Sequence, residues 1–140
     1  DRTRFAPAEG LSRGGYVLAD AENGKPELLL LASGSEVTLA VEAYHQLTAA
    51  GVRARVVSMP SFELFEAQTE VYRDEVLPPT VTARVAIEAG IRQGWDRYLG
   101  GGGAFVGMSG FGASAPFEKI YEEFGFTIKN VVAQAKQQLG

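Results

Sequence analysis

Apolar and polar positions along the chain follow two alternating periods, and their order predicts an α/β domain. A continuous apolar run at 28–32 is typical of a strand buried on both faces of a sheet. The next apolar residues have helical spacing from Val37 to Leu47, with Gly51 as the expected end of that helix. Further strands are expected at 52–58, 83–88 and 104–108. Strands that alternate with helices favour a mostly parallel sheet covered by helices on both faces.

The first strand is expected to run against the others. It covers residues 16–20 and is closed by the turn-forming pair Asn23-Gly24. The link to the run at 28–32 is too short for a crossover helix, so we expect this strand to pair antiparallel at an edge of the sheet. The predicted fold is a three-layer α/β/α sandwich with about five strands. Residues 1–14 are predicted to be a linker or extension, and residues 15–140 the domain.

Four further helical segments are predicted. One opens at Pro60-Ser61 and is broken by Pro78-Pro79, and the next places Ile91, Trp95 and Tyr98 on one side. The last two share the end of the chain, where Gly125 is expected to end one helix before another begins. Their apolar stripes are Phe117, Ile120, Tyr121 and Phe124, then Ile128, Val131, Val132 and Ala135.

Composition narrows the possible partners and chemistry. The 140 residues are 46% hydrophobic and 21% charged, which is ordinary for a globular protein. A net charge of −4 argues against nucleic acid and anionic membranes as partners, because phosphate neutralisation needs a basic face. The chain has no cysteine, so a thiolate nucleophile and a Cys-based metal site are excluded. No apolar run approaches the ~20 residues of a membrane-spanning helix.

Small polar residues follow several predicted strands, where ligands bind in folds of this class. At a helix N-terminus such residues favour a phosphate or carboxylate. The alternative is that they only cap helices: Ser33 with Glu36 fits a capping box, and Ser61 and Ser114 fit simple caps. The candidate ligand crevice comprises Ser33, Gly34, Ser35, Glu36, Ser58, Ser61, Glu88, Gly110, Gly112 and Ser114.

Known catalytic and metal-binding patterns do not assemble. Residues 110–115 match G-x-G-x-x-A, but helix follows where a dinucleotide site needs a second strand that ends in an acidic residue. Two stretches that approach the nucleophile elbow lack its closing glycine, and His45 is the only histidine. His, Asp and Glu show no metal-ligand spacing. We therefore expect no catalytic residue and no metal ligand in this chain.

Six stretches, in this order and spacing, resemble the C-terminal domain of transketolase from about Gly14 to the end of the chain. They are Gly14–Leu18, Ala32–Val37, Val56–Pro60, Ala86–Gly90 with Gly94-Trp95 and Tyr98, Phe111–Pro116, and Phe124–Thr127 with Asn130–Val132.

The resemblance implies that this chain is one piece of a larger catalytic protein. Such an enzyme moves a two-carbon ketol group from a ketose phosphate to an aldose phosphate in the cytoplasm, as a homodimer. The resemblance implies that its N-terminal domain binds the diphosphate of thiamine diphosphate and the magnesium (or calcium), and that the middle domain of the partner subunit covers the rings of the cofactor. The C-terminal domain would then be accessory and inactive alone, bind no cofactor, add to the dimer interface and offer a possible regulatory site.

Two alternatives stay open on the sequence. The chain could be a free-standing module that binds an anion or nucleotide at the turns 33–36 and 110–114. It could also be the equivalent domain of another thiamine-diphosphate enzyme, although the stretches 111–116 and 124–127 favour transketolase.

Overall fold

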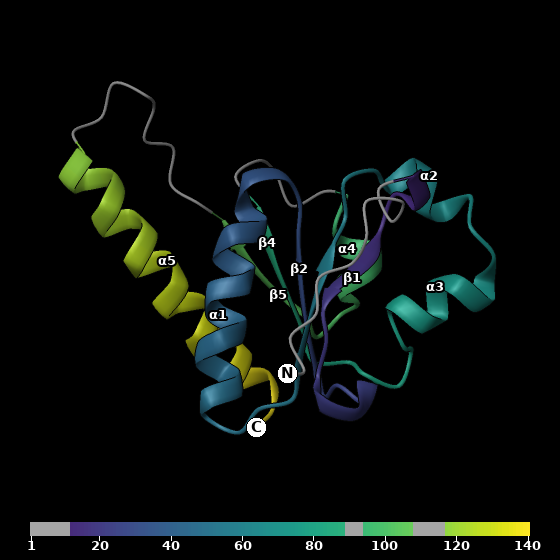
Figure 1. Cartoon of the computed structure of the whole chain (residues 1–140), viewed down its shortest axis with the longest axis horizontal. Helices are drawn as coiled ribbons and strands as arrows, with labels where there is room; N and C mark the ends of the chain where they lie inside the picture. Colours follow the sequence, from purple (N-terminus) through teal and green to yellow (C-terminus); the bar gives the residue numbers. More distant parts are fainter. Residues whose placement is uncertain (1–11, 89–93, 108–116) are drawn as a thin grey trace.

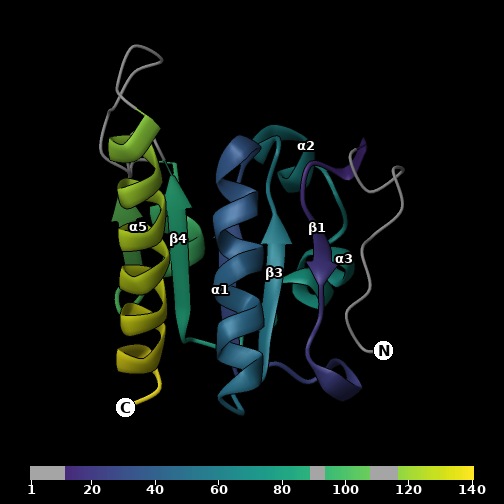
Figure 2. The same cartoon turned by 60° about the vertical axis from the view of Figure 1, so that its left-hand side comes forward.

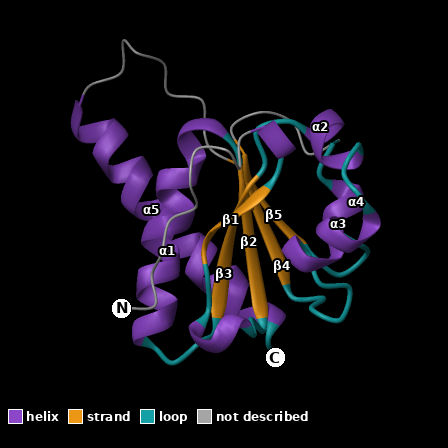
Figure 3. Ribbon diagram, turned by 45° about the vertical axis from the view of Figure 1, so that its right-hand side comes forward, coloured by secondary structure: helices purple, strands orange, loops and turns teal. Residues whose placement is uncertain are grey.

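Four consecutive leucines form the centre of the sheet. The computed structural model describes residues 12–88, 94–107 and 117–140. β2 (Leu28–Ala32) lies between β3 (Ala54–Ser58) and β4 (Arg84–Glu88), and β5 (Ala104–Gly107) lies beyond β4 (Figure 3). All these pairings are parallel. Every residue of β2 and β3 is buried. For β2, the continuous apolar pattern predicts this burial on both faces.

The first strand is antiparallel and lies at an edge, which confirms the prediction. β1 (Tyr16–Ala19) pairs with β3 instead of β2, the strand that follows it in the chain. The turn η2 (Glu22–Gly24) reverses the chain, with Asn23 at φ 67°. Ala19, where a regular ladder would have Leu18, pairs with Val56, so β1 contains a β-bulge.

One face of the sheet is covered by α1 (Val37–Ala49) and α5 (Phe117–Gln138), which lie side by side in Figures 1 and 2. α1 follows the short turn η3 (Gly34–Glu36). Alternate residues of the central strands, such as Leu28, Leu30 and Val56, pack into one apolar cluster with these helices. Period-two alternation within a continuous apolar run therefore supplies this half of the core.

The opposite face is covered by α2 (Phe62–Glu66), α3 (Glu70–Val76) and α4 (Asp96–Leu99) (Figure 1). Leu29, Leu31 and Val57 point into this second cluster. Together the two clusters confirm the three-layer sandwich. No helix among the described residues is long and apolar enough to cross a membrane.

The helical stretch predicted between Pro60 and Pro78 is two short helices. Its interruption has a local cause, because the Thr69 hydroxyl accepts a hydrogen bond from Tyr72 N–H at 3.1 Å and thereby starts α3. The helix predicted around Ile91, Trp95 and Tyr98 is described only from residue 94, and its described part holds the single turn α4.

The prediction that Gly125 ends a helix is wrong. α5 runs from Phe117 to Gln138 without a break, and Gly125 is exposed within it. Glycine costs about 1 kcal/mol relative to alanine inside a helix. Burial of Ile128, Val131 and Ala135 against the sheet contributes more than this cost, at roughly 1.5–3 kcal/mol for a large aliphatic side chain.

Gly125→Ala is expected to raise the free energy of unfolding of the chain by about 0.5–1 kcal/mol, because it removes that helix cost. A Cβ at this position meets no atom within 4 Å. Denaturant unfolding of the two proteins measures the difference. A loss of stability would show that something other than helix propensity determines the effect of Gly125.

Candidate functional site

Three of the predicted crevice residues lie at the carboxyl edge of the sheet, and two of them are in contact. Ala32 of β2 pairs with Ser58 on one side and with Ile87 on the other. Ser33 and Glu88, which follow Ala32 and Ile87, are therefore close, and the Ser33 hydroxyl donates to Glu88 Oε1 at 3.0 Å. Ser58 is buried at the end of β3.

A second donor to Glu88, which the sequence did not reveal, completes this arrangement. Trp95 Nε1–H donates to the same Glu88 oxygen at 3.2 Å. The Trp95 ring is buried and packs edge-to-face on Phe62, with ring centroids 4.9 Å apart. Gly94 makes this contact possible, since a Cβ there would lie 2.5 Å from the Phe62 ring. The pair Gly94-Trp95 was the available signal.

The start of α1 differs from the capping-box hypothesis. The backbone carbonyl of Ser33, in place of its hydroxyl, accepts from Glu36 N–H at 3.2 Å, and the hydroxyl donates to Glu88. Glu36 is buried, and Gly34 has the left-handed φ of 60°. The side chain of Ser35 lies outside the described part. Ser33 therefore ties two strands together at their ends.

Ser61 is a helix cap, as the capping alternative in the sequence analysis predicted. Its hydroxyl accepts from Leu64 N–H at 3.2 Å, and its own N–H donates to the Gly14 carbonyl at 3.0 Å. Gly110, Gly112 and Ser114 lie outside the described residues.

The chemistry of the described edge follows from its carboxylates, Glu88 and the buried Glu36. Glu88 accepts two hydrogen bonds on one oxygen, and its negative charge disfavours an anion in contact with it. No group of three or more His, Cys, Asp or Glu within residues 12–88, 94–107 and 117–140 could hold a metal ion. The described geometry favours a structural role for this edge over anion binding.

A second polar cluster, missed in the sequence, surrounds Glu66. The Tyr98 hydroxyl donates to Glu66 Oε2 at 2.7 Å, and Arg73 and Arg97 form ion pairs with the same carboxylate at 3.4 and 3.6 Å. A cavity of about 340 Å³ is lined in part by Phe65, Glu66 and Arg73. Burial, followed by the Glu66 carboxylate, raises the pKa of Tyr98 to about 12.

Tyr98 is expected to make stability fall at high pH. The protonated phenol is favoured in the folded state, so its contribution is complete below the ordinary pKa of 10 and is lost as pH rises toward about 12. The melting temperature of the wild type should fall more steeply across this range than that of Tyr98→Phe. Parallel curves would contradict the assignment.

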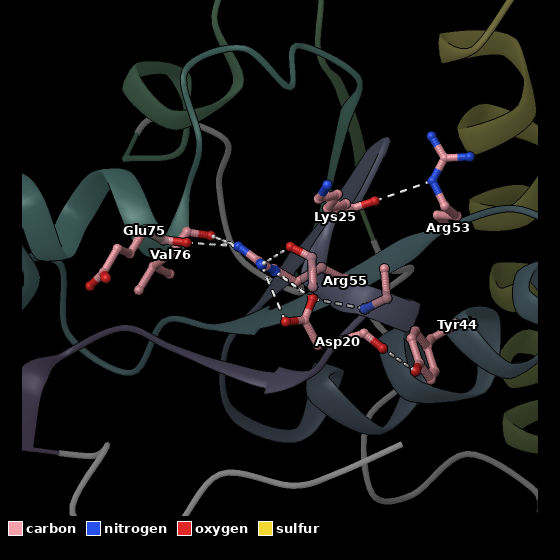
Figure 4. Close-up of polar contacts among 9 residues, drawn as sticks. Asp20, Lys25, Tyr44, Arg53, Arg55, Glu75 and Val76 are labelled. Atoms are coloured by element: carbon pink, nitrogen blue, oxygen red, sulfur yellow. Dashed lines mark hydrogen bonds and ion pairs between the residues drawn. The ribbon is translucent and has the colours of Figure 1, made fainter. Parts of the chain in front are cut away.

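A third network joins three elements through a buried cation (Figure 4). Arg55, in the middle of β3, donates from Nε to Asp20 Oδ1 at 2.8 Å and from NH1 to the carbonyls of Glu75 and Val76 at 2.7 and 3.1 Å. The Tyr44 hydroxyl donates to the Asp20 carbonyl at 2.6 Å. A charged residue inside an apolar strand was the signal for this network.

Arg84 is a further half-buried cation, at the start of β4. Its guanidinium donates to the carbonyls of Val81, Tyr98 and Pro78 at 2.9, 2.6 and 2.9 Å. Burial lowers the pKa of Arg84. These contacts hold the loop before β4 against the end of α4.

The family model, the curated relatives and the solved structures that resemble this chain all belong to transketolases. A model of the transketolase-like C-terminal domain matches residues 14–127. Transketolase 1 of Escherichia coli (strain K12) is 60% identical over 129 residues, which are 92% of this chain and 19% of that protein. The solved transketolase from Leishmania mexicana is 44% identical with a TM-score of 0.79, over 95% of this chain and 19% of that one.

A second solved structure contains a shorter relative. It is described as a split gene transketolase in an inactive beta4 tetramer, and it is 26% identical with a TM-score of 0.63. The match covers 91% of this chain and 43% of that one. The chain thus spans about a fifth of the full-length relatives, and it belongs to the transketolase-like C-terminal domain family.

Proposed function

We propose that this chain is the accessory C-terminal domain of a transketolase and is inactive alone. The whole enzyme would transfer a two-carbon ketol group from a ketose phosphate to an aldose phosphate. One observation carries the proposal: identity of 60% with Escherichia coli Transketolase 1 extends over only 19% of that protein. Most of the enzyme would lie in other domains of the same polypeptide.

The split-gene relative supports inactivity. Its chain is more than twice as long as the part that matches this domain, since the match covers 43% of it. The tetramer of that longer chain is nevertheless described as inactive. This description supports the proposal that a domain of this family needs further parts before transfer occurs, and we extend the same requirement to the present chain.

The chemistry of the parent enzyme is part of the same proposal. Thiamine diphosphate would supply a nucleophilic carbon to carry the ketol group, with magnesium or calcium holding its diphosphate in the other domains. The parent would be a cytoplasmic homodimer acting on sugar phosphates. In this domain, Ser33, Glu88 and Trp95 would hold the ends of two strands together, so the domain itself would bind no cofactor.

A transfer assay tests the proposal. The isolated chain, supplied with thiamine diphosphate, magnesium, a ketose phosphate and an aldose phosphate, is expected to give no turnover above the blank. The parent protein, identified by reading the gene upstream of the codon for Asp1, is expected to turn over. Transfer by the isolated chain would overturn the accessory role, and a parent without transfer activity would overturn the family-based function.

A further inference from the structure

The chain is fastened to α2 and α3 at the point where it joins the domain. We name residues 13–15 the joining segment. The Gly14 carbonyl accepts from Ser61 N–H at 3.0 Å, and the Gly15 carbonyl accepts from the Tyr72 hydroxyl at 2.8 Å. The Arg13 guanidinium lies over the Tyr72 ring, 4.7 Å from its centroid. Both helices therefore hold this segment.

Gly14 packs so tightly against α2 that the backbone there has no room for a side chain. Its φ is +79°, and a Cβ there would lie 2.4 Å from both Phe65 N and Ser61 O. The same Cβ would lie 2.6 Å from Leu64 Cβ, so Leu64 borders the joining segment. The direction in which the chain arrives is fixed against α2.

The same two helices expose large apolar side chains. Leu64 of α2 is 47% exposed and Val71 of α3 is 72% exposed. Burial of either side chain against an apolar surface would be favourable. Leu64 borders the joining segment, and Val71 directly precedes Tyr72, whose hydroxyl donates to the Gly15 carbonyl. Exposed apolar residues next to the residues that hold this point of chain attachment indicate a covering partner that arrives along that chain.

We propose that the joining face, defined by residues 13–15 with Leu64 and Val71, is the surface on which this domain contacts the preceding domain of its own polypeptide. The inference rests on the proposed function, because about four-fifths of the Escherichia coli relative lies outside the matched region and the matched family is the C-terminal one. The partner is an apolar patch of that preceding domain. Tyr72 is a positioning residue, since it acts on the attachment through Gly15.

Limited proteolysis of the full-length parent tests the contact. Trypsin cleavage after Arg13, within the joining segment, is expected to be about tenfold faster when Leu64→Ser and Val71→Ser are combined, because loss of two apolar contacts loosens the domains. The matched control is Leu139→Ser, whose side chain is 37% exposed at the other end of the chain. It is expected to leave the rate unchanged.

A second pair of variants tests the hydrogen bond from the Tyr72 hydroxyl to the Gly15 carbonyl. Tyr72→Phe removes the bond to Gly15 and keeps the ring, so cleavage should accelerate about fivefold. Tyr16→Phe is the control, because it removes the same hydroxyl group from a tyrosine of β1. Wild-type rates for both the double variant and Tyr72→Phe would overturn the inference. The assay needs no turnover, so a parent without transfer activity would overturn only the proposed function.

Discussion

Arg55→Ala is expected to lower the free energy of unfolding by about 2–4 kcal/mol, less than the full range of about 3–5 kcal/mol for breaking a buried ion pair, because the Asp20 side chain left behind is 32% exposed. The Arg55 side chain is only 7% exposed and its Nε lies 2.8 Å from Asp20 Oδ1. The substitution leaves that carboxylate without its cation and deprives the carbonyls of Glu75 and Val76 of a donor. Urea unfolding followed by circular dichroism measures the change.

Arg53→Ala provides the matched control, two residues away in the chain. The Arg53 side chain is 56% exposed, and its ion pair with Glu27 is long, at 3.8 Å. Exposed pairs contribute about 0–1 kcal/mol, so this variant should unfold almost as the wild type does. Equal losses for the two arginines would show that the Arg55 network contributes nothing beyond surface charge.

Gly14→Ala is expected to lower the free energy of unfolding by about 2–5 kcal/mol. Two costs combine: the left-handed backbone at φ +79° costs about 1–2 kcal/mol for a residue with a Cβ, and overpacking costs about 1–3 kcal/mol. The overlap is with backbone atoms of Phe65 and Ser61, at 2.4 Å. Backbone in a capped helix cannot move aside as a flexible side chain can. Thermal or denaturant unfolding gives the measurement.

Gly51→Ala separates the two costs. Gly51 has a similar φ of +88°, but a Cβ there meets no atom within 4 Å. It should therefore lose only the backbone part, about 1–2 kcal/mol. If Gly14→Ala cost no more than Gly51→Ala, the tight fit of the joining segment against α2 would be refuted.

The layers of this fold could be predicted because its patterns are local. The run 28–32 is apolar at every position, and a strand of that kind is buried on both faces. Gly125 misled the prediction, because the free energy that keeps α5 continuous comes from burial of residues farther along the helix. Propensity is local, whereas the packing that outweighs it is not.

The site was harder to predict because it depends on strand order. Ser33 and Glu88 are 55 residues apart, and they meet only because β4 pairs with β2. Nothing local in the sequence distinguishes this pairing from other orders. Asp20 and Arg55 come together through the antiparallel pairing of β1 with β3, and the sequence predicted an antiparallel edge strand without identifying its partner.

The bulge in β1 has a consequence for how copies of this domain behave at high concentration. A flat, free strand edge is a template for a strand from another molecule. Here both edge strands have four residues, and the extra residue between Val17 and Ala19 twists one edge away from a regular ladder. Growth of fibrils by adding strands is thereby disfavoured, and self-association of folded copies is directed to the helical surfaces.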